Sequence, residues 1–135
     1  MTITKIIVNY LLTAVVFFAI DMVWLGFIAK NLYRNYLGNL LSNQVNWPAA
    51  IIFYLLYIVG ISFFAIYPAV SKGSVSSAIL YGALFGFFAY ATYDLTNLAT
   101  LKDWPIQITF IDIAWGVILT SLVSTAGFYI VNFLK

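Results

Sequence analysis

The chain of 135 residues is 64% hydrophobic, and only 7% of its residues are charged, whereas about a quarter of the residues in a soluble domain are charged. A soluble fold of this composition would have too little polar surface, so the sequence predicts one all-α domain, residues 1–135, embedded in a lipid bilayer. The absence of cysteine and histidine excludes disulfides, thiol chemistry, histidine-bound haem and typical zinc sites, and a net charge of +2 argues against nucleic acid as a partner.

Four apolar stretches follow one another along the chain, and each is near or above the roughly 20 residues that a helix needs to cross the hydrocarbon core. They cover about residues 6–29, 48–70, 75–99 and 106–134. No small-x-small cleavage site precedes Asp21, so the first stretch is predicted to be an uncleaved helix rather than a signal peptide. The sequence therefore predicts a bundle of four transmembrane helices. Both chain ends and the 71–74 loop lie on one side, called side A, and the other two connections lie on side B.

The first connection on side B, residues 30–46, is the longest between predicted helices. Its apolar residues recur at helical spacing, with polar residues between them. This pattern favours a short amphipathic helix in the headgroup plane over an ordinary polar loop. The apolar residues are Leu32, Tyr33, Tyr36, Leu37, Leu40 and Leu41.

Two helix starts on side B share one signature, Asn46-Trp47-Pro48 before the second helix and Asp103-Trp104-Pro105 before the fourth. Asn and Asp side chains accept hydrogen bonds from the free N–H groups of a helix start, and proline fits the first turn. Tryptophan prefers the headgroup level of a membrane. We therefore expect Asn46 and Asp103 to cap these helices.

The positive-inside rule does not orient this chain, because the lysine and arginine counts on the two sides are equal. Side A has Lys5, Lys72 and Lys135, and side B has Lys30, Arg34 and Lys102. The direction of insertion therefore stays open.

Three of the four aspartates, Asp21, Asp94 and Asp112, fall within the apolar stretches. Ionisable side chains are costly inside a membrane and usually mark functional sites. With a rise of 1.5 Å per residue, all three lie roughly 8 to 12 Å below side B. We therefore predict that they face one interior cavity open toward side B and form a ligand- or proton-binding site. The alternative is that each aspartate only links neighbouring helices through hydrogen bonds.

Four further residues are expected around this cavity, since each is three or four positions from one of the aspartates and so shares its helix face. They are Trp24, Tyr90, Asn97 and Trp115. On the same face of the third helix as Asp94, Gly82 and Gly86 form a small-xxx-small pair, which is typical of close helix packing.

The three carboxylates cannot all remain ionised without a counter-charge. A proton, a metal ion, or a lysine or arginine reaching inward from side B would relieve the repulsion. Oxygen ligands favour a hard cation, so Mg²⁺, Ca²⁺ or Na⁺ is the cofactor expected if Asp21, Asp94 and Asp112 bind a metal.

Three segments together resemble a bacterial family catalogued as domain of unknown function 2177. They are Ile20-Asp21-Met22-Val23-Trp24-Leu25-Gly26, then Tyr93-Asp94-Leu95-Thr96-Asn97 running on to Trp104-Pro105, and Asp112-Ile113-Ala114-Trp115-Gly116. The likeness covers essentially the whole chain. It implies a small multi-pass membrane protein, expected in a bacterial inner (cell) membrane, and it implies no particular activity.

Three functions fit these observations. The first is proton- or cation-linked transport or small-ligand binding at the aspartates, for which one chain is a thin pathway and a homodimer is expected. The second is a membrane enzyme that acts on a lipid or isoprenoid-like substrate. The third is a non-catalytic, lipid-contacting subunit of a membrane complex. We rank the first above an enzyme, because no DxxD spacing and no histidine or glutamate base is present.

Overall fold

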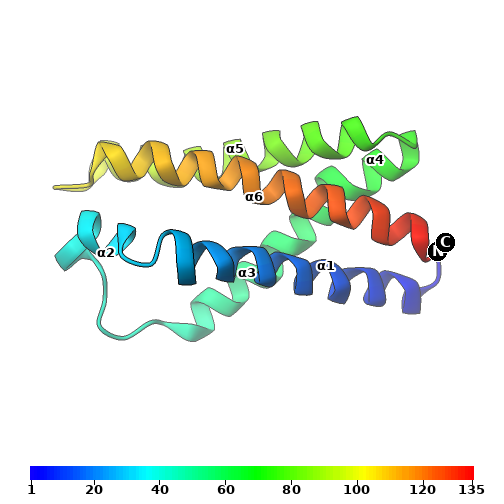
Figure 1. The fold of residues 1–135 in the computed structure, drawn as a ribbon, viewed down its shortest axis with the longest axis horizontal. Helices are drawn as coiled ribbons and strands as arrows, with labels where there is room; N and C mark the ends of the chain where they lie inside the picture. Colours follow the sequence, from blue (N-terminus) through cyan, green and yellow to red (C-terminus); the bar gives the residue numbers. More distant parts are fainter.

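A computed structural model describes all 135 residues as an all-helical bundle without strands (Figure 1). Four helical segments are long and apolar enough to cross a membrane: Ile3–Ile28, Trp47–Lys72, Val75–Thr100 and Ile106–Phe133. Each begins and ends within three residues of its predicted range, which confirms the predicted fold class. Both chain termini lie at one end of the bundle (Figure 1), as side A requires.

The first segment changes its helical form near side B. Helix α1 (Ile3–Val23) continues directly into a π-helical turn, η1 (Trp24–Ile28), in which the Ala29 N–H donates to the Trp24 carbonyl oxygen at 2.7 Å. The buried side chains of α1 include Asn9, Thr13 and Asp21. These three share one face, so the polar side of the first helix points into the protein.

The long side B connection contains α2 (Leu32–Leu37) and a 3₁₀ turn, η2 (Gly38–Leu40). The helix is shorter than the predicted amphipathic segment, because Gly38 has a φ of 48°, a left-handed value that ends an α-helix. Helix α2 also packs against α6 (Ile106–Phe133). It therefore folds back onto the bundle.

The second segment is bent. It consists of α3 (Trp47–Ile61), a π-helical turn η3 (Ser62–Ile66) and α4 (Tyr67–Lys72). Pro68 explains the irregular turn, since proline has no N–H to donate and its ring clashes with the carbonyl four residues before it. Beyond the bend, η3 and α4 pack on α5, whereas α3 packs against α1 (Figure 1). The bend thus directs the side B half of the segment away from α5.

The third and fourth segments, α5 (Val75–Thr100) and α6, form the closest helix pair of the bundle. A Cβ added to Gly82 would lie 2.7 Å from the Thr120 carbonyl oxygen and 2.7 Å from the Ser124 Cβ. A Cβ added to Gly86 would lie 2.7 Å from the Thr120 hydroxyl. Only glycine permits this approach, which confirms the packing role predicted for the small-xxx-small pair.

The two side B helix starts differ, although their sequences are alike. Asn46 caps α3, and its Oδ1 accepts from the Ala49 N–H at 3.2 Å. Asp103 does not cap α6, because it adopts a φ of 60° in the loop and the helix begins only after Pro105. The predicted cap at Asp103 is therefore wrong.

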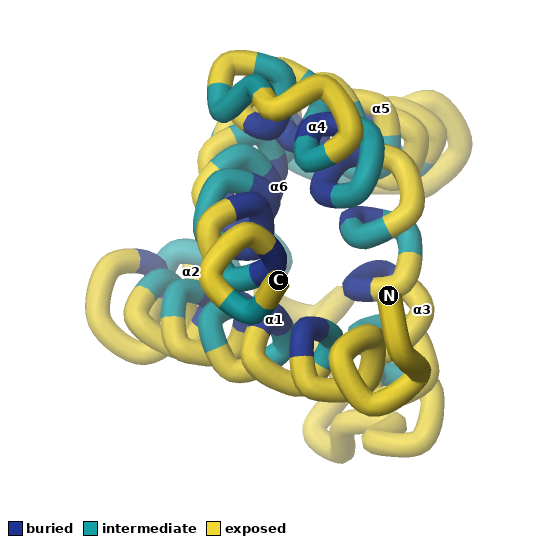
Figure 2. Tube along the Cα trace, turned by 90° about the vertical axis from the view of Figure 1, so that its right-hand side faces the viewer, coloured by how far each residue is buried: buried dark blue, intermediate teal, exposed yellow.

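An apolar core fills the middle of the bundle and the half toward side A. Phe17, Ile58, Ile61, Leu119 and Val123 are all buried in it. The buried residues face the interior, and the exposed ones face outward around the bundle (Figure 2). Many of the exposed residues are large and apolar, as expected of a surface in contact with lipid.

Candidate functional site

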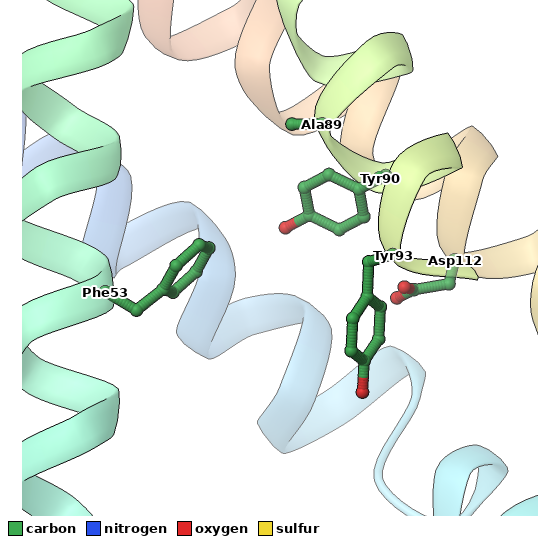
Figure 3. A pocket seen from close by; sticks show the side chains of 5 residues that line it. All are labelled: Phe53, Ala89, Tyr90, Tyr93 and Asp112. Atoms are coloured by element: carbon green, nitrogen blue, oxygen red, sulfur yellow. The ribbon is translucent and has the colours of Figure 1, made fainter. Parts of the chain in front are cut away.

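The side B half of the bundle contains an open cavity of about 590 Å³. Its lining comes from α1, η1, α3, α5 and α6, and the α2 region adds Tyr33 and Leu37. A second hollow of about 330 Å³ shares Phe53, Tyr90, Tyr93 and Asp112 with it. Phe53 of α3 lies across this hollow from Tyr90 and Tyr93 of α5, with Asp112 of α6 beside Tyr93 (Figure 3). The bend at η3 creates this space by separating α3 from α5.

Asp112 accepts a hydrogen bond from a residue of α2. The Tyr33 hydroxyl donates to Asp112 Oδ1 at 2.7 Å and accepts from the Trp24 indole N–H at 3.0 Å. These two hydrogen bonds join the first connection on side B to η1 and α6. A hydrogen bond to a carboxylate is stronger than one between neutral groups, so Tyr33 holds α2 over the cavity.

Tyr33 can act only as a hydrogen-bond donor toward this aspartate. Its burial, and then the neighbouring charge of Asp112, raise the pKa of the Tyr33 phenol well above its ordinary value. The hydroxyl therefore keeps its proton throughout the physiological pH range. It positions the Asp112 carboxylate and does not serve as a base.

Asp21 of α1 also lines the cavity and is 5% exposed. Its carboxylate accepts from the Trp115 indole N–H at 3.3 Å and from the Tyr54 hydroxyl at 3.4 Å. The Trp115 ring stacks on Trp24, with 4.4 Å between centroids and 6° between planes. Trp115 donates to Asp21, and Trp24 donates to the Tyr33 hydroxyl that contacts Asp112. The stacked pair therefore connects the two aspartates.

Asp94 is completely buried, at 0% exposure, and is not among the residues that line the cavity. Neither of its carboxyl oxygens has a hydrogen-bond donor. The side chain within hydrogen-bonding reach is Asp112, which is also an acceptor when it is ionised. Asp94 is therefore behind the cavity wall and in contact with it through Asp112.

The structure divides the predicted trio. Asp21 and Asp112 line the cavity, whereas Asp94 is buried within hydrogen-bonding reach of the half-buried Asp112. No group of three carboxylates is arranged to hold a metal ion, so the three-aspartate arrangement considered for Mg²⁺, Ca²⁺ or Na⁺ is not formed. No lysine or arginine lines the cavity, and Lys30, Arg34 and Lys102 are all exposed.

Of the four surrounding residues predicted, the structure brings Trp24, Tyr90 and Trp115 to the cavity. Asn97 is half-buried outside it, within hydrogen-bonding reach of Tyr93. Sequence reasoning missed eight of the 13 lining residues, four of them aromatic: Phe53, Tyr54, Tyr93 and the α2 residue Tyr33. Tyr33 had a signal in the helical spacing of its connection, and Tyr93 adjoins Asp94, but neither pattern predicts contact with an aspartate of α6.

The sequence matches the family described as "Predicted membrane protein (DUF2177)" over residues 6–129. The chain belongs to this DUF2177 family. The matched range contains Asp21, Asp94 and Asp112 and almost all of the four long helices. Family membership and the four helices together identify an integral, multi-pass membrane protein. No curated protein and no solved structure matches the chain.

Proposed function

We propose that this DUF2177 protein binds a small membrane-soluble ligand in the side B cavity and links binding to a proton shared by Asp94 and Asp112. The observation that carries the proposal is the Asp94 carboxyl, which is fully buried and has no hydrogen-bond donor. A buried charge without a partner is strongly unfavourable. A proton on Asp94 would supply the missing donor, because the carboxyl could then donate to Asp112.

The proton would couple to the ligand through Asp112, which lies beside Asp94 and also lines the cavity. When a hydrogen-bond donor or a positive charge of the ligand approaches Asp112, the Asp94 O–H bond breaks and the proton leaves to water on side B. The ligand then takes over the stabilisation of the carboxylate pair. The titratable groups around the pair are Asp21 of α1, Tyr33 of α2, Tyr54 of α3, and Tyr90 and Tyr93 of α5.

Transport by alternating access is the form of this function that we favour. The apolar core beneath the cavity includes Phe17, Ile58 and Leu119, each at most 1% exposed. These side chains close the bundle toward side A, so the cavity is not accessible from that side. A site inside the membrane with one side closed is typical of one state of a secondary transporter.

Carbodiimide labelling tests the proposal without knowledge of the natural ligand. Dicyclohexylcarbodiimide is apolar, enters from lipid and reacts with protonated carboxyl groups. In proteoliposomes it should modify the Asp94–Asp112 pair in preference to Asp103, which is exposed in the α5–α6 loop. A water-soluble carbodiimide should show the reverse preference. Peptide mass spectrometry would locate both modifications.

Asp94→Asn is the decisive variant, and Asp103→Asn is its matched control. An asparagine amide donates to Asp112 without an ionisable proton, so labelling of the pair by the apolar reagent should be lost in Asp94→Asn and retained in Asp103→Asn. Equal labelling of Asp112 in the wild type and in Asp94→Asn would contradict a shared proton. Absence of labelling at either aspartate in the wild type would contradict an accessible ligand site.

An enzyme that acts on a lipid is the second candidate. The observation that favours it is that two carboxylates, those of Asp21 and Asp112, line one cavity beside lipid-exposed residues. Mass spectrometry of native lipids incubated with the wild type and with Asp21→Asn would detect a product dependent on the carboxylate. A homodimer and residence in a bacterial inner membrane stay predictions, which crosslinking and membrane fractionation would test.

A further inference from the structure

The cavity combines negative charge with aromatic walls. Asp21 and Asp112 are its only ionisable groups other than tyrosines, and no basic residue lines it. The tyrosine and tryptophan donors nearest to these carboxylates are already used in hydrogen bonds to them. A phosphate or carboxylate ligand would therefore meet repulsion and few free donors. A ligand with a positive charge would meet two acceptors.

The aromatic walls favour one type of cation. Trp24, Trp115, Tyr54, Tyr90 and Phe53 surround the two carboxylates. Aromatic faces attract organic cations, most strongly where water is excluded. A small hydrated metal ion would leave this apolar surface uncovered, whereas a cation with hydrophobic substituents would cover it. The volume of about 590 Å³ is in the range of cavities that enclose drug-sized ligands.

The opening of the cavity faces the hydrocarbon region of the membrane. Phe53 of α3 and Tyr93 of α5 stand on either side of the smaller hollow (Figure 3). They are 52% and 57% exposed, respectively, on the outer surface of two membrane-spanning segments. A ligand dissolved in the bilayer can therefore pass between α3 and α5. Toward the water on side B, α2 covers the cavity through Tyr33.

From these features we infer that the ligand is a lipophilic organic cation, an amine or onium compound, that enters from the bilayer between α3 and α5 and binds Asp112 and Asp21. The inference rests on the proposed function and specifies its substrate class. The positive charge of the ligand replaces the proton of the carboxyl pair, so the charge of the site changes little during exchange. The aromatic residues contact the apolar substituents.

Two probes of nearly the same size and shape and of opposite charge test this inference. Tetraphenylphosphonium is the cation and tetraphenylborate is the anion. Equilibrium binding of radiolabelled probe to protein in zwitterionic lipid nanodiscs, with empty nanodiscs subtracted, separates binding from partition into lipid. Saturable binding of the phosphonium, and not of the borate, is expected. Asp112→Asn should weaken phosphonium binding roughly tenfold or more, and the loop control Asp103→Asn should leave it unchanged.

A second measurement uses only the wild-type protein, in case Asp112→Asn does not fold. Phosphonium should slow the modification of Asp112 by dicyclohexylcarbodiimide, and borate should not. Phosphonium binding that does not saturate, or protection by borate equal to that by phosphonium, would overturn the inference about charge. The carbodiimide result without any probe decides the proposed function separately, because it requires only an accessible protonated carboxyl. Labelling of the pair without protection by phosphonium would therefore leave the proposed function standing and reject the cation.

Discussion

Tyr33→Phe is the substitution that most directly tests how α2 is held over the cavity. It removes one hydroxyl and keeps the aromatic ring, so apolar burial is nearly unchanged. The lost hydroxyl donates to Asp112 at 2.7 Å and accepts from Trp24 at 3.0 Å. In Tyr33→Phe, while α2 stays packed over the cavity, Asp112 Oδ1 and the Trp24 indole N–H lose this hydroxyl as their partner. When α2 opens, water can replace them.

The magnitude follows from the type of bond. A hydrogen bond to a charged group contributes about 1.5–3 kcal/mol, more than one between neutral groups. Each 1.4 kcal/mol changes an equilibrium constant tenfold, so the open population of α2 should rise roughly 10- to 100-fold. The effect should be local, because the apolar core and the close contact of α5 with α6 lie elsewhere.

Limited trypsin digestion in detergent measures this opening. Arg34 lies on α2 and is exposed, but its backbone is helical, and the Asn35 N–H donates to the Asn31 carbonyl at 2.9 Å. A protease needs an extended segment, so cleavage after Arg34 requires α2 to unfold or detach. The cleavage rate follows the open population when opening and closing are faster than cleavage. We expect cleavage after Arg34 to be roughly 10- to 100-fold faster in Tyr33→Phe.

Tyr36→Phe is the matched control, because it makes the same chemical change in the same helix at a side chain that is 41% exposed. Cleavage after Lys102, in the exposed α5–α6 loop, is the internal control in the same sample, because it does not depend on the opening of α2. Equal rates at Arg34 in the two variants would refute the role of the Tyr33 hydroxyl. A parallel increase at Lys102 would show a global effect and would also contradict the reasoning.

Three further substitutions test the helix packing, the caps and the aromatic pair. Gly82→Ala forces α5 and α6 to separate by roughly 0.7 Å to restore normal contact. It should lower the free energy of unfolding in detergent by about 1–3 kcal/mol. Gly26→Ala is the control and should cost almost nothing, because a Cβ at Gly26 has no atom within 4 Å. Asn46→Ala should lose about 1 kcal/mol of stability with its cap, while Asn46→Asp, which keeps the acceptor oxygen, should show almost no loss. An equal loss in both would contradict the capping role of Asn46. Trp115→Phe removes a buried donor to the α1 carboxylate and should destabilise the protein by about 1–3 kcal/mol, and an unchanged unfolding midpoint would show that this bond contributes nothing.

The sequence determined the helices of this protein because helix length and polarity are local properties. A stretch of some 20 apolar residues has no stable state in a bilayer other than a helix, and the constant rise per residue determines the depth of each aspartate. The inward polar face of α1 and the glycine pair of α5 could be predicted for the same reason. These patterns selected Asp21, Asp94 and Asp112 alike as cavity residues, and only Asp21 and Asp112 line the cavity.

Only the tertiary structure decided which side chains meet in the cavity. Depth does not specify the rotation of a helix about its axis, so the position of Asp94 behind the cavity wall was not predictable from spacing. The bend at η3 separates α3 from α5, and its size depends on how neighbouring helices pack around Pro68. The loop conformation of Asp103 and the bond from Tyr33 to Asp112, 79 positions apart, depend on how the chain returns over the bundle. Contacts between residues so distant in sequence have no local pattern, and only packing determines them.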